Sequence, residues 1–200
     1  MTCWVVIPTK APAQAKGRLA TALDSDQRGA LAEAMLDRAV KAVSAARVSG
    51  GLALVGTSRM GQPRTQELLT DPGGGLNAAV HSARDALAAR GATRLITLAA
   101  DLPLLEYGDV AALCELPAGV IGIAPDRHGT GTNALSLPLP EALDFAYSYG
   151  IGSCALHKAE AKRLGLPIAL IASPGLARDI DEPADLADAG DLLTKGREQP

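Results

Sequence analysis

Short runs of aliphatic and β-branched residues alternate with longer alanine-rich segments along the first half of the chain. Residues 3–7, 52–56 and 94–100 are predicted strands, whereas residues 26–47 and 76–90 repeat their apolar positions with the period of a helix. Alternation of this kind is typical of βαβ units, in which helices cover a parallel sheet. The pattern therefore predicts an α/β fold with a mainly parallel central sheet.

The second half of the chain continues the pattern with shorter elements. Further strands are predicted at residues 119–124, 133–137, 167–172 and 176–181, with helices near residues 106–115, 153–164 and 183–190. Sheets of this type bind ligands at the carboxyl ends of their strands. We therefore look for chemistry in the segments that follow strands, within one expected domain at residues 1–192; residues 193–200 form a polar tail.

The composition excludes several classes of protein. The chain has 200 residues, 48% of them hydrophobic, and a formal net charge of −3 without a basic stripe, so a single domain is expected and nucleic-acid binding is not. Its three cysteines form no CxxC pair, which favours a reducing cytoplasm over a disulfide or thiolate–zinc framework. The apolar start is too short for a signal peptide or a membrane span.

Two loops carry features suited to a nucleotide. Lys10, Lys16 and Arg18 follow the first strand and could converge on a polyphosphate, although a solvated basic loop is the plain alternative. The loop is neither a P-loop nor a GxGxxG turn. Three glycines ending at Gly75 then precede a helix whose free amides could face a base or ribose. Asn77, at the start of that helix, could bind the nucleotide or simply cap the helix.

Carboxylates follow two predicted strands. Asp101 ends the run at residues 94–100, where it could bind a metal or ribose or cap the next helix. If residues 176–181 form a strand, Asp179 and Asp181 project from the same face, which is costly without a cation. Oxygen ligands without nitrogen or sulfur favour Mg²⁺ or Mn²⁺, and Asp101 could be the third ligand. The alternative is a solvated turn.

Two glycine-spaced segments, "DRHGTGTNAL" and "YSYGIGSCALH", carry hydroxyls and backbone amides. Ser153 is expected to cap the helix that follows it, and this helix start, with Thr132, could form an anion site. Tight turns with ordinary capping are the alternative. His128 and His157 are expected to be surface or packed histidines, because no two histidines have the spacing of zinc ligands.

Together these segments resemble the guanylyltransferases of coenzyme F420 biosynthesis. The resemblance covers nearly the whole chain and rests on motifs in the family's order, namely "PTKAPAQAKGRL", "GLNAA", "ADLP", "GTGTN", "GIGS" followed by a histidine, and "DIDEPADL". It implies a Rossmann-like, three-layer nucleotidyltransferase fold (GT-A-like). It also implies an Mg²⁺-dependent enzyme that moves GMP from GTP onto a small three-carbon phospho-acid and releases pyrophosphate.

The resemblance also implies roles for residues. Asp101, Asp179 and Asp181 would hold the metal and, with Lys16, form the catalytic centre; the acceptor acid would meet Thr132, Gly150 and Ser153. Lys10, Lys16 and Arg18 would face the triphosphate.

The acceptor would be 2-phospho-L-lactate, phosphoenolpyruvate or 3-phospho-D-glycerate. His128 could pair with the extra hydroxyl of phosphoglycerate, and the small Ala78 leaves room for it, which favours that acid. The resemblance implies that the product passes to a transferase that makes the deazaflavin coenzyme. It is also compatible with a homodimer of this chain.

Two rival interpretations remain open from the sequence. A nucleotidyltransferase for molybdopterin or a sugar phosphate would share the fold, but the glycine-rich "GG.S.RMG.DK"-like opening of those families is missing. A non-catalytic regulatory module that binds nucleotides would keep the glycines but would not need the carboxylates.

Overall fold

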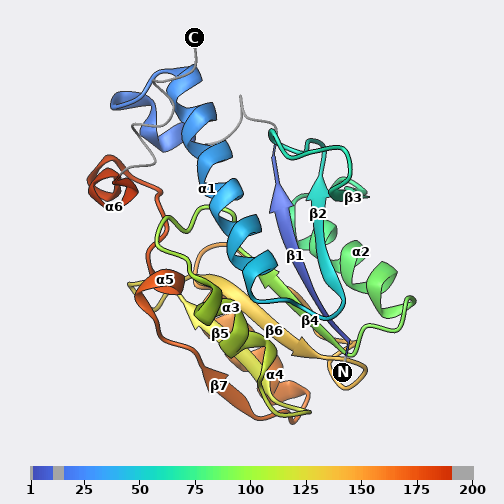
Figure 1. The fold of residues 1–200 in the computed structure, drawn as a ribbon. Coiled ribbons are helices and arrows are strands. Elements are labelled where there is room, and N and C mark those ends of the chain that lie inside the picture. The colour runs from blue at the N-terminus through green and yellow to red at the C-terminus, as the bar shows by residue number, and fades with distance from the viewer. Residues whose placement is uncertain (1, 11–15, 191–200) are drawn as a thin grey trace.

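The fold is built on a seven-stranded sheet with the order β3-β2-β1-β4-β6-β5-β7 (Figure 1). The computed structural model describes residues 2–10 and 16–190, so the predicted tail at residues 193–200 lies outside the described residues. The strands are β1 (Cys3–Thr9), β2 (Gly51–Gly56), β3 (Glu67–Thr70), β4 (Arg94–Leu98), β5 (Ile121–Pro125), β6 (Thr132–Pro138) and β7 (Ile168–Leu170).

Six of these strands run in one direction, and β6 alone is antiparallel to its neighbours. β6 reverses because only a short turn connects it to β5. The Asp126 carboxylate accepts hydrogen bonds from the amides of His128, Thr130 and Gly131, which closes that turn. The prediction of an α/β fold with a mainly parallel sheet is thus confirmed.

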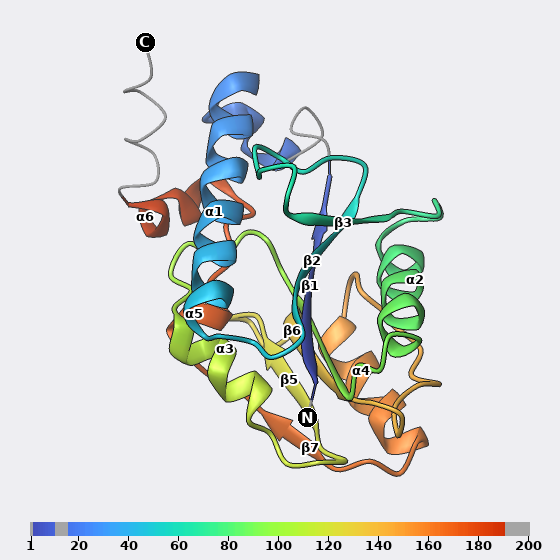
Figure 2. The ribbon, with the colours of Figure 1, turned by 45° about the vertical axis from the view of Figure 1, so that its right-hand side comes forward.

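Helices cover both faces of the sheet, which gives three layers (Figure 2). One face carries α1, α3 and α5, and the other carries α2 and α4. The helices are α1 (Ser25–Ala45), α2 (Leu76–Ala88), α3 (Tyr107–Cys114), α4 (Ser153–Arg163), α5 (Pro174–Ala177) and α6 (Leu186–Ala189), with short 3-10 helices η2 (Gly17–Thr21) and η3 (Pro183–Asp185).

The alternation of side chains along β1 explains why both faces are covered. Val5 and Ile7 pack in one cluster with Leu36 of α1, whereas Val6 packs in another with Leu87 of α2. All five side chains are completely buried. Each contributes about 1.5–3 kcal/mol relative to an exposed position, so the two helices are fixed against the central strand from opposite sides.

The predicted strand at residues 176–181 was wrong. Residues Pro174–Ala177 form α5 instead, because Ser173 caps this helix through the amide of Leu176 and a proline occupies its first position. Residues 178–182 are irregular. β3 was missed because three of its four residues are only half-buried, the fourth is exposed, and the strand carries little apolar signal.

No helix in the part of the chain that the structure describes is both long and apolar enough to cross a membrane.

Candidate functional site

A cavity of about 480 Å³ opens where β1, β2 and β4 end. This is the edge of the sheet at which an α/β fold binds its ligands. Seven of the residues singled out from the sequence line it, namely Lys10, Lys16, Arg18, Gly75, Asp101, Thr132 and Asp181. Gly150, Ser153, Asn77, Asp179 and His128 are not among its lining residues.

Lys16 joins two carboxylates that lie far apart in the sequence. Its Nζ is 2.5 Å from Oδ2 of Asp101 and 3.2 Å from Oδ1 of Asp181. The Lys16 side chain is only 9% exposed. Burial alone would lower the pKa of Lys16, but the two carboxylates outweigh burial and raise it, so the ammonium stays charged.

The backbone of Lys16 is in the left-handed region, with φ 55°. For a residue with a side chain this conformation costs on the order of 1 kcal/mol. Lys16 is the residue immediately before η2, and with this backbone conformation its Nζ lies between the two carboxylates. Arg18 follows but is 73% exposed, and its Nη1 lies 3.7 Å from Asp181, so this pair adds little to stability.

Asp179 stands behind these groups and is the poorly neutralised member of the cluster. Burial raises the pKa of its carboxyl, and repulsion by Asp101 and Asp181 raises it further. Partial relief comes first from a hydrogen bond of the Asp179 backbone amide and then from Asn133, whose Nδ2 donates to Asp179 Oδ1 at 3.4 Å and to the carbonyl of Leu176 at 2.9 Å. The cluster therefore holds negative charge that an additional cation would stabilise.

The carboxylates are brought together by loop contacts and not by the strand alternation that we expected. The amide of Ile180 donates to the carbonyl of Asp101 at 3.2 Å. Asp185, which is 3% exposed, accepts hydrogen bonds from the amides of Asp181 and Glu182 at 2.9 and 2.8 Å. The prediction that Asp179 and Asp181 lie near Asp101 holds, but its reason was wrong.

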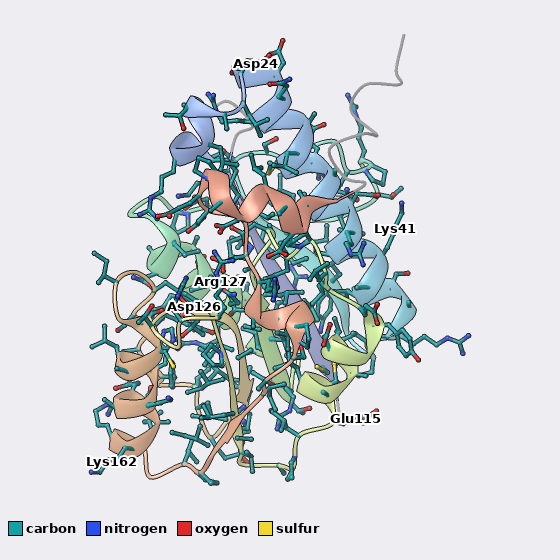
Figure 3. All side chains as sticks on the ribbon, turned by 90° about the vertical axis from the view of Figure 1, so that its left-hand side faces the viewer. Asp24, Lys41, Glu115, Asp126, Arg127 and Lys162 are labelled. Atoms are coloured by element: carbon teal, nitrogen blue, oxygen red, sulfur yellow. The ribbon has the colours of Figure 1, made fainter. Side chains whose placement is uncertain are left out.

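An arginine from another part of the chain secures this loop. Arg127 pairs with Asp185 and lies 3.7 Å from Asp188. Figure 3 shows Asp126 and Arg127 between α4 and the C-terminal helices. Burial alone would raise the pKa of Asp185, but the hydrogen bond from Arg127 and those from the two amides lower it, so Asp185 stays ionised and holds Asp181 in place.

The carboxylates of this cluster have the right chemistry for a hard divalent cation, but they are not spaced to bind one. Asp101, Asp179 and Asp181 offer only carboxylate oxygens, which Mg²⁺ prefers. Within residues 2–10 and 16–190, however, no three Asp, Glu, His or Cys side chains are spaced to hold a metal ion. Lys16 Nζ stands between Asp101 and Asp181, so a metal would have to share or displace that ammonium.

The glycine loop opens α2 toward the cavity. Gly73, Gly74 and Gly75 have φ of 83°, 89° and 89°, a conformation that other residues adopt only at a cost. The first helical bond runs from the amide of Ala79 to the carbonyl of Gly75 at 3.1 Å. The three preceding amides have no acceptor among the described residues, so they are available to an anion.

Asn77 neither caps α2 nor lines the cavity. Gly75 is the N-cap, and the Asn77 side chain holds the backbone of Tyr149 instead: Oδ1 accepts from the Tyr149 amide at 2.7 Å and Nδ2 donates to its carbonyl at 3.2 Å. Tyr149 lines the cavity and directly precedes Gly150. Asn77 thus ties the glycine loop to the segment that leads into α4.

The first amides of α4 are less available to a ligand than the sequence suggested. The helix begins at Ser153, so its N-cap is not Ser153 but Gly152, where a φ of 73° favours glycine. The amide of Ser153 donates to the carbonyl of Gly150 at 3.1 Å, and that of Cys154 to the carbonyl of Thr130 at 3.0 Å. Two amides expected to bind an anion are therefore already occupied.

His128 does not face the cavity. It is exposed on the turn at residues 126–131 and contacts Arg127 there. The interpretation that His128 selects the acceptor acid loses its structural basis.

His157 is packed, which is one of the two placements expected for it. The sequence reasoning missed Asn133, Tyr149, Arg127 and Asp185, which have structural or cavity roles. Asn133 follows Thr132 directly in "GTGTN", so its polarity in an otherwise apolar strand was the available signal. The others depend on contacts between segments distant in the sequence.

Comparison with solved structures identifies the class of fold. The chain superposes on a CMP:2-keto-3-deoxy-manno-octonic acid synthetase complexed with CTP, with a TM-score of 0.61 and 10% identity, over 98% of this chain and 99% of the other. A 4-diphosphocytidyl-2C-methyl-D-erythritol synthase superposes with a TM-score of 0.63 and 15% identity, over 96% and 99%. The fold is that of the nucleotidyltransferases.

Sequence comparison then identifies the family. Residues 3–199 match the family described as "Guanylyl transferase CofC like". A phosphoenolpyruvate guanylyltransferase of Sphaerobacter thermophilus is 40% identical over 93% of this chain and 91% of the relative. One of Conexibacter woesei is 38% identical over 98% and 91%. The chain belongs to the CofC-like guanylyl transferase family.

Proposed function

We propose that this protein transfers the guanylyl group of GTP to the phosphate of a three-carbon phospho-acid and releases pyrophosphate, in the biosynthesis of coenzyme F420. Family membership supports the activity. The observation that carries the proposal is one cavity lined by Lys16, Asp101 and Asp181 from three distant segments, with Gly75 and Thr132.

The proposed reaction needs charge neutralisation more than proton transfer. A phosphomonoester has its second pKa near 6, so it is mostly a dianion at neutral pH and can attack without a general base. An oxygen of the acceptor phosphate forms a bond to the α-phosphorus of GTP, and the bond from that phosphorus to the bridging oxygen of the β-phosphate breaks. Two anions must be held in line for this step.

The described residues divide this task. The open amides at the start of α2, with Gly75 at the rim, suit the nucleotide, and Lys10, Lys16 and Arg18 suit its triphosphate. Thr132 and Tyr149, which also line the cavity, suit the acceptor acid. Asn77 would act on nucleotide and acceptor indirectly, through Tyr149.

We propose Mg²⁺ as the cofactor, held by Asp101, Asp179 and Asp181. When bound, it would neutralise the phosphate oxygens that gain charge in the transfer. The raised pKa of Asp179, caused by burial and by its two carboxylate neighbours, is the feature that such a cation would relieve. Lys16 would then be released from Asp101 and Asp181 toward the triphosphate.

We propose phosphoenolpyruvate as the acceptor, because the relatives with 40% and 38% identity carry that name. The earlier preference for 3-phospho-D-glycerate rested on His128, which is exposed and does not line the cavity.

The test offers the purified protein GTP with equal concentrations of phosphoenolpyruvate, 2-phospho-L-lactate and 3-phospho-D-glycerate, with Mg²⁺ or with a chelator. We expect pyrophosphate release only when an acid and Mg²⁺ are both present, and a mass that corresponds to the guanylylated phosphoenolpyruvate. Release without any acid, or no release with all three, would contradict guanylyl transfer. A dominant adduct of another acid would contradict only the choice of acceptor, and turnover unchanged by chelation would contradict the metal.

A further inference from the structure

A completely buried histidine lies directly behind the cavity wall. His157 on α4 has 0% exposure, and both of its ring nitrogens are partnered inside the protein. Nδ1 lies 3.0 Å from Oγ1 of Thr132, and Nε2 accepts a hydrogen bond from the amide of Ser148 at 3.1 Å. The ring therefore cannot touch a ligand, but it touches a residue that does line the cavity.

The partner of Nε2 determines where the ring proton is. A backbone amide can only donate, so Nε2 must be the unprotonated nitrogen. Burial lowers the pKa of His157 to about 4, which keeps the ring neutral at neutral pH. The single remaining proton is on Nδ1, where it donates to Thr132. The opposite tautomer would place two donors, Nε2–H and the Ser148 amide, against each other.

Ring contacts hold the imidazole in this orientation. Tyr149 meets it edge-on, with centroids 4.9 Å apart and an angle of 75° between the planes, and the ring of Phe145 lies 5.7 Å away. A flipped ring would also lose both hydrogen bonds. Orientation and tautomer are thus fixed together.

The fixed tautomer has a consequence for Thr132. Its hydroxyl has one proton and two lone pairs, and Nδ1–H occupies a lone pair. The proton of the hydroxyl has no acceptor among the residues that the structure describes, apart from the His157 nitrogen that itself donates. Thr132 is 8% exposed and borders the cavity, so this proton can be offered to a ligand there.

We propose that His157 is a positioning residue. It makes Thr132 a hydrogen-bond donor toward a carboxylate oxygen of the acceptor acid. The assignment of an acceptor acid to this side rests on the proposed function. A carboxylate oxygen only accepts, so it matches a hydroxyl whose lone pair is already used. His157 acts through Thr132 and takes no part in the chemistry itself.

Two substitutions test the roles of the two ring nitrogens separately. His157→Asn keeps a donor near the position of Nδ1, whereas His157→Gln keeps an acceptor near the position of Nε2 and loses the donor to Thr132. We expect His157→Gln to raise the acceptor KM roughly 10-fold or more, with little change in the GTP KM, and His157→Asn to raise it much less. A merely structural role would make both variants lose activity in step with their stability.

Thr132 supplies the matched control. Thr132→Val should raise the acceptor KM by a similar factor, Thr132→Ser should not, and His157→Gln should add nothing in the Thr132→Val background. Equal effects of the two His157 variants, or additive effects with Thr132→Val, would overturn the proposal.

A measurement without turnover keeps the proposal separate from the proposed function. Nitrogen NMR of the His157 ring, assigned by its disappearance in His157→Gln, should show Nδ1 protonated and Nε2 unprotonated at neutral pH. A proton on Nε2 would overturn the proposal whatever the activity. If the expected tautomer is found but no acid is guanylylated, the proposed function fails, and so does the assignment of an acceptor carboxylate to Thr132.

Discussion

The two sides of the cavity are built in opposite ways. On the side of β1 and the C-terminal loop, Lys16 faces Asp101 and Asp181, while Asp179 is poorly neutralised. On the side of α4, Thr132 and His157 are neutral, buried and hydrogen-bonded to each other. A cation would stabilise the charged side further, whereas the neutral side has its own hydrogen bonds and only the Thr132 hydroxyl proton left to offer a ligand. Under the proposed function, charge neutralisation and substrate positioning would fall to separate parts of the same cavity.

The starts of helices α2 and α4 differ in whether their first amides are already hydrogen-bonded. The first amides of α2 have no acceptor among the described residues, but those of Ser153 and Cys154 in α4 are occupied by carbonyls. An open helix start attracts an anion, and an occupied one holds its surroundings rigid. The α2 side is accordingly suited to phosphate binding, and the α4 side to presenting a fixed hydroxyl.

Removing a carboxylate from the charged side should have the largest effect. We expect Asp101→Asn and Asp179→Asn each to reduce turnover on the order of 10³-fold, because the charge developed on phosphate oxygens would lose its cation. Burial and repulsion raise the pKa of Asp179, so its charge destabilises the fold. Asp179→Asn should therefore unfold at a higher denaturant concentration than the wild type without Mg²⁺.

The control for this pair is Asp37→Asn, which removes an exposed carboxylate from a surface pair with Lys41. It should leave turnover and stability almost unchanged. Near-normal turnover of Asp101→Asn and Asp179→Asn at limiting Mg²⁺ would refute the metal site. A large loss of stability would point to a structural role for these carboxylates.

Removing the buried cation should have the next largest effect. Lys16→Ala should reduce kcat/KM for GTP roughly 10²-fold, since an ammonium near the triphosphate would be lost, with a much smaller change in the acceptor KM. Steady-state kinetics with each substrate varied in turn measures the difference. Lys41→Ala, on the exposed surface of α1, is the matched control. Unchanged GTP kinetics in Lys16→Ala would contradict the assignment of Lys16 to the nucleotide.

The neutral side of the cavity should make the stability of the protein sensitive to acid, through His157. The folded pKa of His157, about 4, lies below its ordinary value of 6.5, so the unfolded chain binds the proton more readily between these values. Stability from this group is present above about pH 6.5 and is lost as the pH falls toward 4. Between pH 7 and pH 4.5 the loss should be about 2 kcal/mol.

Urea unfolding at these two pH values measures the loss, with His157→Gln as the variant that should not show it. His128→Gln is the control, because His128 is exposed and should keep the acid sensitivity of the wild type. Equal acid sensitivity in wild type and His157→Gln would mean that the ring is not held neutral.

The fold was predictable because its signals are local. The apolar period of α1 and α2 and the buried runs of β1 and β4 each lie within one segment, so the sequence alone indicates an α/β fold. Residues 176–181 were mistaken for a strand because alternation over six residues also fits a capped helical turn followed by a loop. Local pattern does not distinguish the two.

The site was predictable only in part because its contacts are not local. The bond between Lys16 and Asp101 spans 85 residues, and that between Lys16 and Asp181 spans 165. The residue types indicated a cation and a carboxylate cluster, but not that Lys16 stands between the carboxylates. The contacts of His157 with Ser148 and Thr132 join separate segments, so the histidine after "GIGS" could be noted in the sequence but its two partners could not be predicted.

The connection between the two sides should show the smallest effect. Asn77, at the start of α2, reaches both backbone groups of Tyr149, so Asn77→Leu removes two hydrogen bonds and leaves a part-buried amide and carbonyl without their partner. We expect a loss of stability of about 1–3 kcal/mol and a rise of a few-fold in the acceptor KM, because Tyr149 itself lines the cavity. Gln66→Leu is the control, since its Nε2 also donates to a backbone carbonyl, that of Leu52 at 2.7 Å, but it does not line the cavity. It should lose stability without any change in the acceptor KM. If both variants lose stability alike and neither alters the acceptor KM, Asn77 serves the fold alone, and the two sides of the cavity are not connected through Tyr149.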